Sequence, residues 1–433
     1  MPDLIAQLLP RLTTNRLPGL DFDDGFIYPD YAGGSILNIP SSLCQLLGIP
    51  ELNGSPLHPE VLTPLLDGGS VRRIVLVLMD ALSLRRLQRW TQGSSQGEPS
   101  SVWQQIARGG VLAPLTSIVP STTSAAIPSL WTGRSAAEHG VAGYELWLKE
   151  YGVVANMIAQ SPMAFHNGTG SLAQAGFDPE KYLPFTTLGT HFAAHGVKTY
   201  ALQHHSIAHS GLSQMFFRDV NVHSFRTPSD LWVNARHLLE THADERMYAW
   251  VYWGELDHLS HYYGPDDECS VAEFASFSAA FERLFFSRLS PELRRDTMVI
   301  LTADHGQIHT KKYSNYDLNR HPEFTRRLHL QPTGENRMAY LYLRPGQYDE
   351  VTGYMDRTWP DQFTLIDPAR AVAAGLFGPG QPHPRLLDRL GDVMAVARGS
   401  AYWWWAEKEN KLQGRHGGLS PDEMLVPFLA ARL

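Results

Sequence analysis

Three apolar, β-prone runs in this sequence each lead into an acidic side chain, and this pattern constrains the fold more than any other feature. The runs cover residues 73–79, 247–254 and 297–303. The acidic residues that follow them are Asp80, Asp257 and Asp304. Segments with helical spacing separate such runs, and this alternation predicts an α/β fold with a mostly parallel central sheet and helices on both faces. Because function gathers at the carboxyl ends of the strands in such a sheet, we expect the three carboxylates at one site.

The order of these segments divides the chain into four parts. Residues 1–70 are rich in Pro, Gly and Asp, which predicts an irregular N-terminal wrap with one or two short helices. Residues 71–305 carry the strand–helix alternation and are predicted to form the catalytic α/β core. The pattern loosens over 306–400, a predicted smaller inserted lobe, and 401–433 return to the core with the last candidate metal ligand. The elements expected in the lobe include a strand at 335–343 and a helix at 348–358.

The composition is typical of a globular protein and excludes several classes of function. Hydrophobic residues make up 43% and charged residues 18% of the 433 positions. No apolar run approaches the ~20 residues of a membrane span. The net charge of −8, without a run of Lys or Arg, provides no basic surface for coating nucleic acid. The N-terminus lacks the basic region of a signal peptide, and the two cysteines are too few for a disulfide framework, so we expect a cytoplasmic, soluble protein.

One hydroxyl side chain stands where a loop is expected to become a helix. Thr123 follows an apolar run that ends at Val119, and it precedes residues 124–132, which predict a short helix. The unpaired N–H groups and the positive dipole end at a helix start favour an anion, such as a phosphate oxygen or a deprotonated hydroxyl. The same residues also suit an ordinary helix N-cap, so Thr123 by itself does not identify a site.

Imidazole side chains accompany the carboxylates. His261 follows Asp257 by four residues, which puts both on one face of a helical turn. His305 is adjacent to Asp304, and His416 lies near the C-terminus. Three carboxylates and three imidazoles, without thiolates, suit a divalent ion such as Zn²⁺ or Mn²⁺. Taken singly, each of these residues also has a structural explanation, such as a cap at a strand end or a hydrogen-bonded histidine.

A set of motifs follows one another in a definite order along the chain. They are Asp80, Pro120-Ser-Thr-Thr123, Thr132-Gly133, His139-Gly140, Asp257-x-x-x-His261-x-x-Gly-Pro265, Asp304-His305-Gly306 and His416-Gly-Gly. This set resembles the alkaline phosphatase superfamily, and within it the type I phosphodiesterase/nucleotide pyrophosphatase family. The resemblance spans residues 71–427. The pairing of Asp-x-x-x-His-x-x-Gly-Pro with Asp-His-Gly in this order is specific, whereas the threonine motif alone is not.

The resemblance implies an alkaline-phosphatase-like fold and an enzyme that hydrolyses phosphate diesters, including nucleotide pyrophosphates, through a phosphothreonine intermediate. It assigns Asp257, His261 and His416 to one divalent ion, and Asp80, Asp304, His305 and the Thr123 oxygen to a second. Thr123 would attack phosphorus, and water would then release the phosphoryl group. The two ions, with zinc expected and manganese as the alternative, would activate the nucleophile and stabilise the leaving oxygen. The expected partner is a small phosphate ester or nucleotide, and the sequence indicates no oligomeric state.

The sequence departs from the family near the threonine. Residues 122–126 are Thr-Thr-Ser-Ala-Ala where the family has Lys-Thr-Phe-Pro-Asn, so the usual aromatic residue is missing. The family's asparagine that holds a non-bridging phosphate oxygen falls on Tyr144, whose phenol can donate the same hydrogen bond. Arg337 is a further candidate for contacting phosphate, with a structural arginine as the alternative. His204, after an expected strand at 197–203, is interpreted as a structural histidine.

Two other functions remain compatible with the sequence. A phosphomonoesterase or phosphomutase of the same superfamily would share the fold, but such relatives typically carry serine as the nucleophile. Mutases also differ from this chain around the last histidine. A pseudoenzyme would keep the fold as a binding or regulatory subunit and would be expected to lack a ligand or the nucleophile. All seven positions are filled here, which favours the enzyme.

Overall fold

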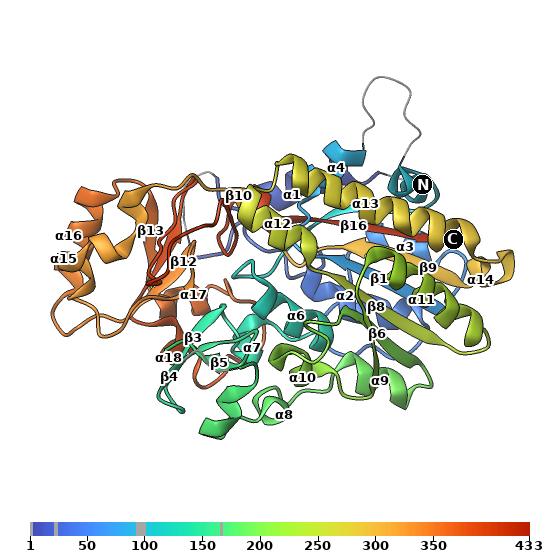
Figure 1. Cartoon of the computed structure of the whole chain (residues 1–433), viewed down its shortest axis with the longest axis horizontal. Helices are drawn as coiled ribbons and strands as arrows, with labels where there is room; N and C mark the ends of the chain where they lie inside the picture. Colours follow the sequence, from blue (N-terminus) through green and yellow to red (C-terminus); the bar gives the residue numbers. More distant parts are fainter. Residues whose placement is uncertain (1–2, 21–24, 92–100, 165–167) are drawn as a thin grey trace.

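The central feature of the computed structural model is a seven-stranded, mostly parallel sheet (Figure 1). The structure describes residues 3–20, 25–91, 101–164 and 168–433. The order of the strands across the sheet is β2-β16-β9-β1-β8-β6-β7. Their bounds are Val111–Thr116 (β2), Leu425–Arg432 (β16), Thr297–Thr302 (β9), Arg73–Met79 (β1), Met247–Trp253 (β8), Lys198–His204 (β6) and Val220–Phe225 (β7). The predicted α/β class is confirmed.

Strand β1 lies at the centre of this sheet, and all of its residues are buried. Its run of β-branched and apolar side chains is typical of a strand that is covered on both faces. It pairs in parallel with β8 on one side and with β9 on the other. Met79 lies opposite Trp253, and Leu78 lies opposite Thr302, so the three strands end together. This register brings the residues that follow β1, β8 and β9 to one edge of the sheet.

One strand breaks the parallel pattern. Strand β16 runs antiparallel to both of its neighbours, β2 and β9. Seven of its eight residues are buried, so this strand lies inside the core. The predicted return of residues 401–433 to the core therefore takes the form of a strand, which the sequence pattern did not indicate.

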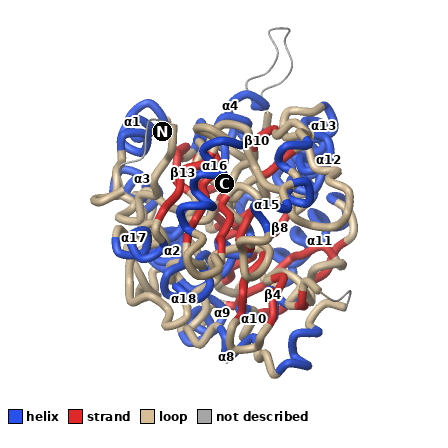
Figure 2. Tube along the Cα trace, turned by 90° about the vertical axis from the view of Figure 1, so that its left-hand side faces the viewer, coloured by secondary structure: helices blue, strands red, loops and turns tan. Residues whose placement is uncertain are grey.

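Helices cover both faces of the central sheet, with the strands inside (Figures 1 and 2). Helix α13 (Glu268–Leu284) packs against α5 (Val102–Gly109), α11 (Pro228–Thr241) and α12 (Glu255–Tyr263). Helix α6 (Thr123–Thr132) packs against α2 (Ile39–Leu46), α9 (Leu188–Ala194) and α10 (Gly211–Phe216). The predicted helix over 124–132 is confirmed.

Shorter helices are α4 (Leu84–Thr91), α7 (Ala136–His139), α8 (Pro179–Tyr182), α14 (Pro291–Arg295) and α19 (Pro421–Met424). The 3₁₀ turns are Ile36–Asn38, Ser171–Ala175, Phe286–Arg288, Ser314–Tyr316 and Leu318–Arg320.

The N-terminal part of the chain is more helical than the composition predicted. Helices α1 (Ile5–Thr14) and α3 (Pro59–Leu66) pack against β2, and α2 packs against α6. These helices bury Leu8, Leu12 and Leu65. Residues 1–2 and 21–24 of the predicted wrap lie outside the described residues. None of the helices in the described ranges is both long and apolar enough to cross a bilayer.

A second, antiparallel sheet forms a small lobe, onto which the view of Figure 2 looks. Its order is β13-β14-β12-β11-β3-β4-β5. The bounds are Phe363–Ile366 (β13), Val393–Ala397 (β14), Met338–Leu341 (β12), Thr333–Glu335 (β11), Glu145–Leu148 (β3), Val153–Asn156 (β4) and Ser161–Pro162 (β5). Its helices are α15 (Pro322–Thr325), α16 (Tyr348–Thr358), α17 (Pro368–Ala373) and α18 (Leu386–Leu390). A two-stranded ribbon of β10 (Ile308–His309) and β15 (Gly414–Arg415) lies apart from both sheets.

The small lobe combines two stretches of the chain. Residues 145–162 supply three of its strands and residues 333–397 supply four, so its sheet extends beyond the stretch 306–400 that the sequence indicated. The predicted strand at 335–343 is confirmed only over 338–341 as β12, because a hairpin turn stands at its start. Glu335 pairs with Met338, and Asn336 and Arg337 form the turn between β11 and β12. The predicted helix over 348–358 is confirmed as α16.

Candidate active site

Six predicted ligands, which come from separate segments of the chain, converge beyond the carboxyl ends of β1, β8 and β9. They are Asp80, Asp257, His261, Asp304, His305 and His416. Donor atoms of Asp257, His261 and His416 all lie within 4.8 Å of one another. Those of Asp80, Asp257 and His305 meet the same limit. The structure thus brings five of these residues together in two adjoining groups that share Asp257, and the sixth, Asp304, has its Oδ2 3.5 Å from His305 Nε2. The predicted helical turn for Asp257 and His261 is confirmed, because both lie on α12.

The three histidines are oriented in the same way by the backbone. In each of them Nδ1 lies within hydrogen-bond distance of a carbonyl oxygen, which holds the ring and leaves Nε2 free to act as a ligand. The distances are 2.8 Å from His261 to Gly414, 2.9 Å from His305 to Gly306 and 3.1 Å from His416 to Ser121. His261 Nε2 lies 3.3 Å from Asp257 Oδ1, and His305 Nε2 lies 3.4 Å from Asp80 Oδ1. Imidazoles that are held in this way are typical of metal sites.

In the described ranges, no lysine or arginine balances the charge of the three carboxylates. No Lys or Arg in the described ranges pairs with Asp80, Asp257 or Asp304, and the fully buried atoms Asp80 Oδ1 and Asp304 Oδ2 have no hydrogen-bond partner. Burial, together with the neighbouring carboxylates, raises the pKa of Asp80 well above its usual range. Burial also raises the pKa of Asp257 to about 7. Charged carboxylates are therefore costly here unless a cation joins them.

The imidazoles show the complementary effect. Burial lowers the pKa of His261 to about 4 and that of His416 well below its usual value. Neutral imidazole is the form that binds a metal ion. Unpartnered carboxylate oxygens and neutral, oriented imidazoles together fit divalent ions such as zinc or manganese, and no thiolate contributes to the groups.

Thr123 stands at the start of α6 and faces the second group of ligands. Its Oγ1 lies 3.1 Å from His305 Nε2 and 3.4 Å from Asp80 Oδ2. The side chain of the N-cap, Thr122, forms no capping hydrogen bond. Within the described ranges, the N–H groups of Thr123 and Ser124 donate no hydrogen bond either, so they remain available to an anion. The predicted position of Thr123 at a helix start is confirmed.

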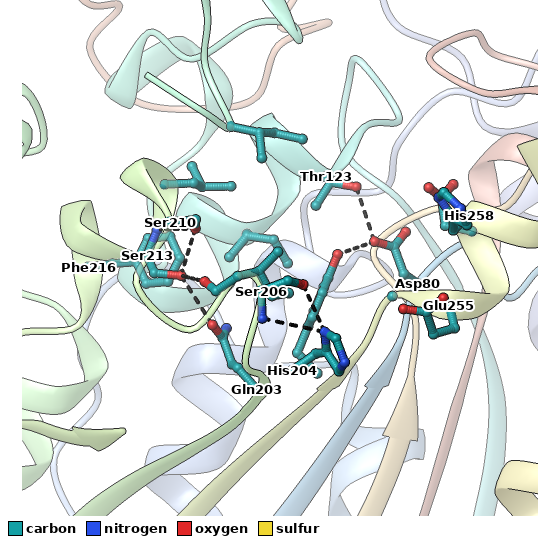
Figure 3. Close-up of a pocket in the computed structure, with 17 residues that line it drawn as sticks. Asp80, Thr123, Gln203, His204, Ser206, Ser210, Ser213, Phe216, Glu255 and His258 are labelled. Carbon is teal, nitrogen blue, oxygen red and sulfur yellow. Dashed lines mark hydrogen bonds between the residues drawn. The ribbon is translucent and has the colours of Figure 1, made fainter. Parts of the chain in front are cut away.

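A cavity of about 370 Å³ opens beside Thr123 (Figure 3). Asp80, Asp257 and Thr123 line its inner end. The remaining wall comes from α6, α10 and the start of α12, from the ends of β6 and β8, from the loop between β6 and α10, and from Ile158. His204 lines this cavity, so the histidine that the sequence analysis interpreted as structural belongs to the wall of the site.

The sequence of the chain was also compared with known families. Residues 74–419 match the family described as type I phosphodiesterase / nucleotide pyrophosphatase. The chain belongs to this family. A member of this metal-dependent family is a hydrolase of phosphoester bonds, and the predicted resemblance is thereby confirmed. No curated protein sequence matches the chain.

Solved structures share the fold of this phosphodiesterase-family protein. Murine ectonucleotide pyrophosphatase / phosphodiesterase 5 is 17% identical, with a TM-score of 0.60, and the match covers 82% of this chain and 87% of the murine chain. An inactive variant of the murine protein was solved in complex with AMP. Phosphonoacetate hydrolase from Sinorhizobium meliloti 1021, in complex with phosphonoformate, is 16% identical with a TM-score of 0.58. That match covers 84% of this chain and 90% of the hydrolase.

Tyr252 is a residue of the site that the sequence analysis missed. It lies near the end of β8, and its phenol donates a hydrogen bond to Asp80 Oδ2. It also lines the cavity. Burial and the nearby carboxylates raise the pKa of this phenol well above its usual value, so it remains a donor. The signal in the sequence was its position, since Tyr252 lies near the end of the predicted strand, five residues before Asp257.

Glu335 is a second missed residue. It lies on β11 of the small lobe, and its Oε1 accepts a hydrogen bond of 2.8 Å from the N–H of Tyr144. Its side chain lies against Gly417, next to His416, where a Cβ on the glycine would come within 2.5 Å of Glu335 Cβ. Burial raises the pKa of Glu335 to about 8, although the Thr122 hydroxyl and the Tyr144 N–H favour its charged form. The small lobe thus reaches the site through a buried carboxyl group.

Tyr144 lies just before β3, close to Glu335 in the small lobe. Its phenol oxygen accepts a hydrogen bond of 2.6 Å from Asn156 Nδ2. Within the described residues, the hydroxyl hydrogen of Tyr144 has no acceptor, so it is available to an incoming ligand. Burial raises the pKa of this phenol to about 12, which keeps it protonated at neutral pH. The contact between Tyr144 and phosphate stays a prediction.

Arg337 does not have the position that was predicted for a phosphate contact. It is fully buried in the turn between β11 and β12. Its Nε and Nη2 donate to the two carboxylate oxygens of Glu423 at 2.7 and 2.9 Å, and its Nη1 donates to the carbonyl of Ala401. Because the guanidinium is occupied by this buried ion pair, Arg337 has the structural role that was the alternative.

Proposed function

We propose that this protein is a phosphodiesterase that uses Thr123 as the nucleophile and two divalent ions, with zinc as the expected metal. One ion would be held by Asp257, His261 and His416, and the other by Asp80, Asp304, His305 and the Thr123 oxygen. When bound, the ions supply the positive charge that lowers the pKa of the threonine hydroxyl and stabilises the leaving oxygen. The observation that carries the proposal is the position of Thr123 Oγ1, between His305 and Asp80 at a helix start.

The reaction proceeds in two displacements. Thr123 Oγ1 forms a bond to phosphorus, the bond from phosphorus to one ester oxygen breaks, and that oxygen leaves as an alcohol with a proton. The product on the protein is a phosphothreonine that still carries the second ester group. Water then forms a bond to phosphorus and the bond to Thr123 Oγ1 breaks, which releases a phosphate monoester and restores the hydroxyl.

The backbone around Thr123 supports this chemistry. Among the described residues, the N–H groups of Thr123 and Ser124 have no other partner. They lie at the positive end of α6, where they can hold a non-bridging phosphate oxygen. Donors that are already oriented need no rearrangement as charge develops on the phosphoryl oxygens. We assign the same role to Tyr144, whose hydroxyl hydrogen has no acceptor among the described residues.

The proposal is tested with a diester and its matched monoester. Protein reconstituted with zinc, and in parallel with manganese, is given bis(4-nitrophenyl) phosphate or 4-nitrophenyl phosphate. We expect a higher kcat/KM for the diester. A preference for the monoester would instead support a phosphatase or mutase of the same superfamily.

The nucleophile is tested separately by mass spectrometry after an acid quench. In the wild-type protein, the peptide with residue Thr123 should gain the mass of the aryl phosphoryl group. Thr123→Ala should lose both this adduct and turnover. Ser124→Ala removes an adjacent hydroxyl that is buried without a hydrogen-bond partner, so it serves as the matched control and should keep the adduct. An active Thr123→Ala protein would refute the assignment.

A further inference from the structure

No lysine or arginine of the described residues lines the cavity beside Thr123, although His204 and His258 belong to its wall. Its apolar part includes Ile127, Ile158, Leu212 and Phe216, and no Lys or Arg lines it in the described ranges. The residues outside those ranges contain neither lysine nor arginine, so they cannot supply one either. A second anionic group in this cavity would therefore lose its water without gaining a lysine or arginine as its partner, which is costly.

The wall of the cavity also carries a carboxylate. Glu255, in the first turn of α12, lines the wall beside His258, and both are labelled in Figure 3. Among the described residues, the Glu255 carboxylate has no ion pair and no hydrogen bond to balance it. A free carboxylate at the wall repels an anion and attracts a cation, and this interaction is strengthened where apolar walls exclude water.

One polar side chain of the wall, Gln203, is oriented by a hydrogen bond and can bind a polar group of the substrate. Ser213 Oγ donates to Gln203 Oε1 at 3.2 Å, and Figure 3 shows this contact at the far side of the cavity from Thr123. The other end of the Gln203 amide has no protein partner in the described part of the chain. An apolar cavity with a few oriented polar groups is typical of sites that bind uncharged organic groups.

From these features we infer that the cavity selects phosphodiesters whose second substituent is uncharged or cationic, and that it discriminates against a substituent with a further negative charge. The inference rests on the proposed function, because it concerns the ester group next to the phosphorus that Thr123 attacks.

Three symmetrical diesters test the inference, since the same substituent enters the cavity whichever ester bond is cleaved. They are bis(4-carbamoylphenyl), bis(4-carboxyphenyl) and bis(4-amidinophenyl) phosphate, whose end groups are nearly equal in shape and differ in charge. Dissociation constants are measured by calorimetry on zinc-loaded Thr123→Ala protein, which removes differences in leaving-group reactivity. The kcat/KM values of the wild-type protein provide the second readout.

We expect the carboxylate ester to bind about tenfold to hundredfold more weakly than the carbamoyl ester, the range of one charge interaction at an effective dielectric constant of about 20. The amidinium ester should bind as tightly or more tightly. Equal or tighter binding of the carboxylate ester overturns the inference but leaves the proposed function intact. If metal-loaded protein neither binds nor hydrolyses any of the three esters, both fail.

Two variants locate the effect in the cavity wall. Ser206 lines the cavity and is exposed, so Ser206→Lys adds a cation with little change in packing. It should improve binding of the carboxylate ester about tenfold, whereas the uncharged control Ser206→Gln should not. Glu255→Gln should reduce the advantage of the amidinium ester. Absence of both shifts would mean that the substituent lies elsewhere, and would overturn the inference.

Discussion

The buried carboxyl group of Glu335 leads to a quantitative prediction about stability. Burial raises its pKa from 4.5 to about 8, so over this interval the group is protonated in the folded protein and ionised in the unfolded chain. The folded state then binds more protons than the unfolded state, and stability falls as the pH rises. Glu335→Gln keeps the shape of the side chain but cannot ionise, so it should remove this contribution.

The size of the effect follows from the interval between the two pKa values. The contribution of one such group changes by about 1.4 kcal/mol for each pH unit. Between pH 4.5 and 8 this amounts to about 4–5 kcal/mol, with no further change below or above the interval.

The assay is urea unfolding of the wild-type and Glu335→Gln proteins from pH 5 to 8.5. A chelator is present throughout, so that the metal-binding carboxylates titrate alike in both proteins. The free energy of unfolding of the wild type should fall more steeply with pH, by about 1.4 kcal/mol per pH unit up to about pH 7.5. Parallel pH profiles for the two proteins would refute the reasoning, because they would show that Glu335 has the same pKa folded and unfolded.

Three further substitutions test individual contacts of the site. Asp304→Ala should reduce the bound metal by one ion per chain and abolish turnover; unchanged metal content, measured by elemental analysis, would remove Asp304 from the ligand set. Tyr252→Phe deletes the hydrogen bond to Asp80 and should weaken metal binding about 10–100-fold in competition with a chelator, the usual effect of losing a partner of a ligand. Tyr144→Phe should lower kcat about tenfold to a thousandfold, the value of one transition-state hydrogen bond, and a wild-type rate would make Tyr144 structural.

The sequence could predict where the candidate ligands meet because their placement is local. Asp80 directly follows a buried strand, and Asp304 lies two residues beyond another. Asp257 and His261 share one face of a helix whose period fixes their relation. Once the strands are parallel and end in register, these side chains must meet at one edge of the sheet. The start of α6 at Thr123 is equally local, since it depends on the residues immediately before and after it.

The errors concern contacts between residues that are distant in the chain. Arg337 was a candidate for contacting phosphate, with a structural role as the alternative. Its partner Glu423 lies 86 residues away, and no local pattern indicates such a pair. The strand predicted at 335–343 is divided by a tight turn whose flanking strands pair with β3 and β14. Strand β3 (Glu145–Leu148) precedes this turn by nearly half the length of the chain.

The sequence by itself determined which chemistry this protein carries, namely a hydroxyl, three carboxylates and three imidazoles at strand ends and helix starts. Only the tertiary structure decided what surrounds that chemistry. The cavity joins Gln203 of β6, Ser213 of α10 and Glu255 of α12, and Glu335 reaches the site from the small lobe. Local periodicity can place a side chain at the end of a strand, but the charge and size of a cavity depend on which distant segments pack around it.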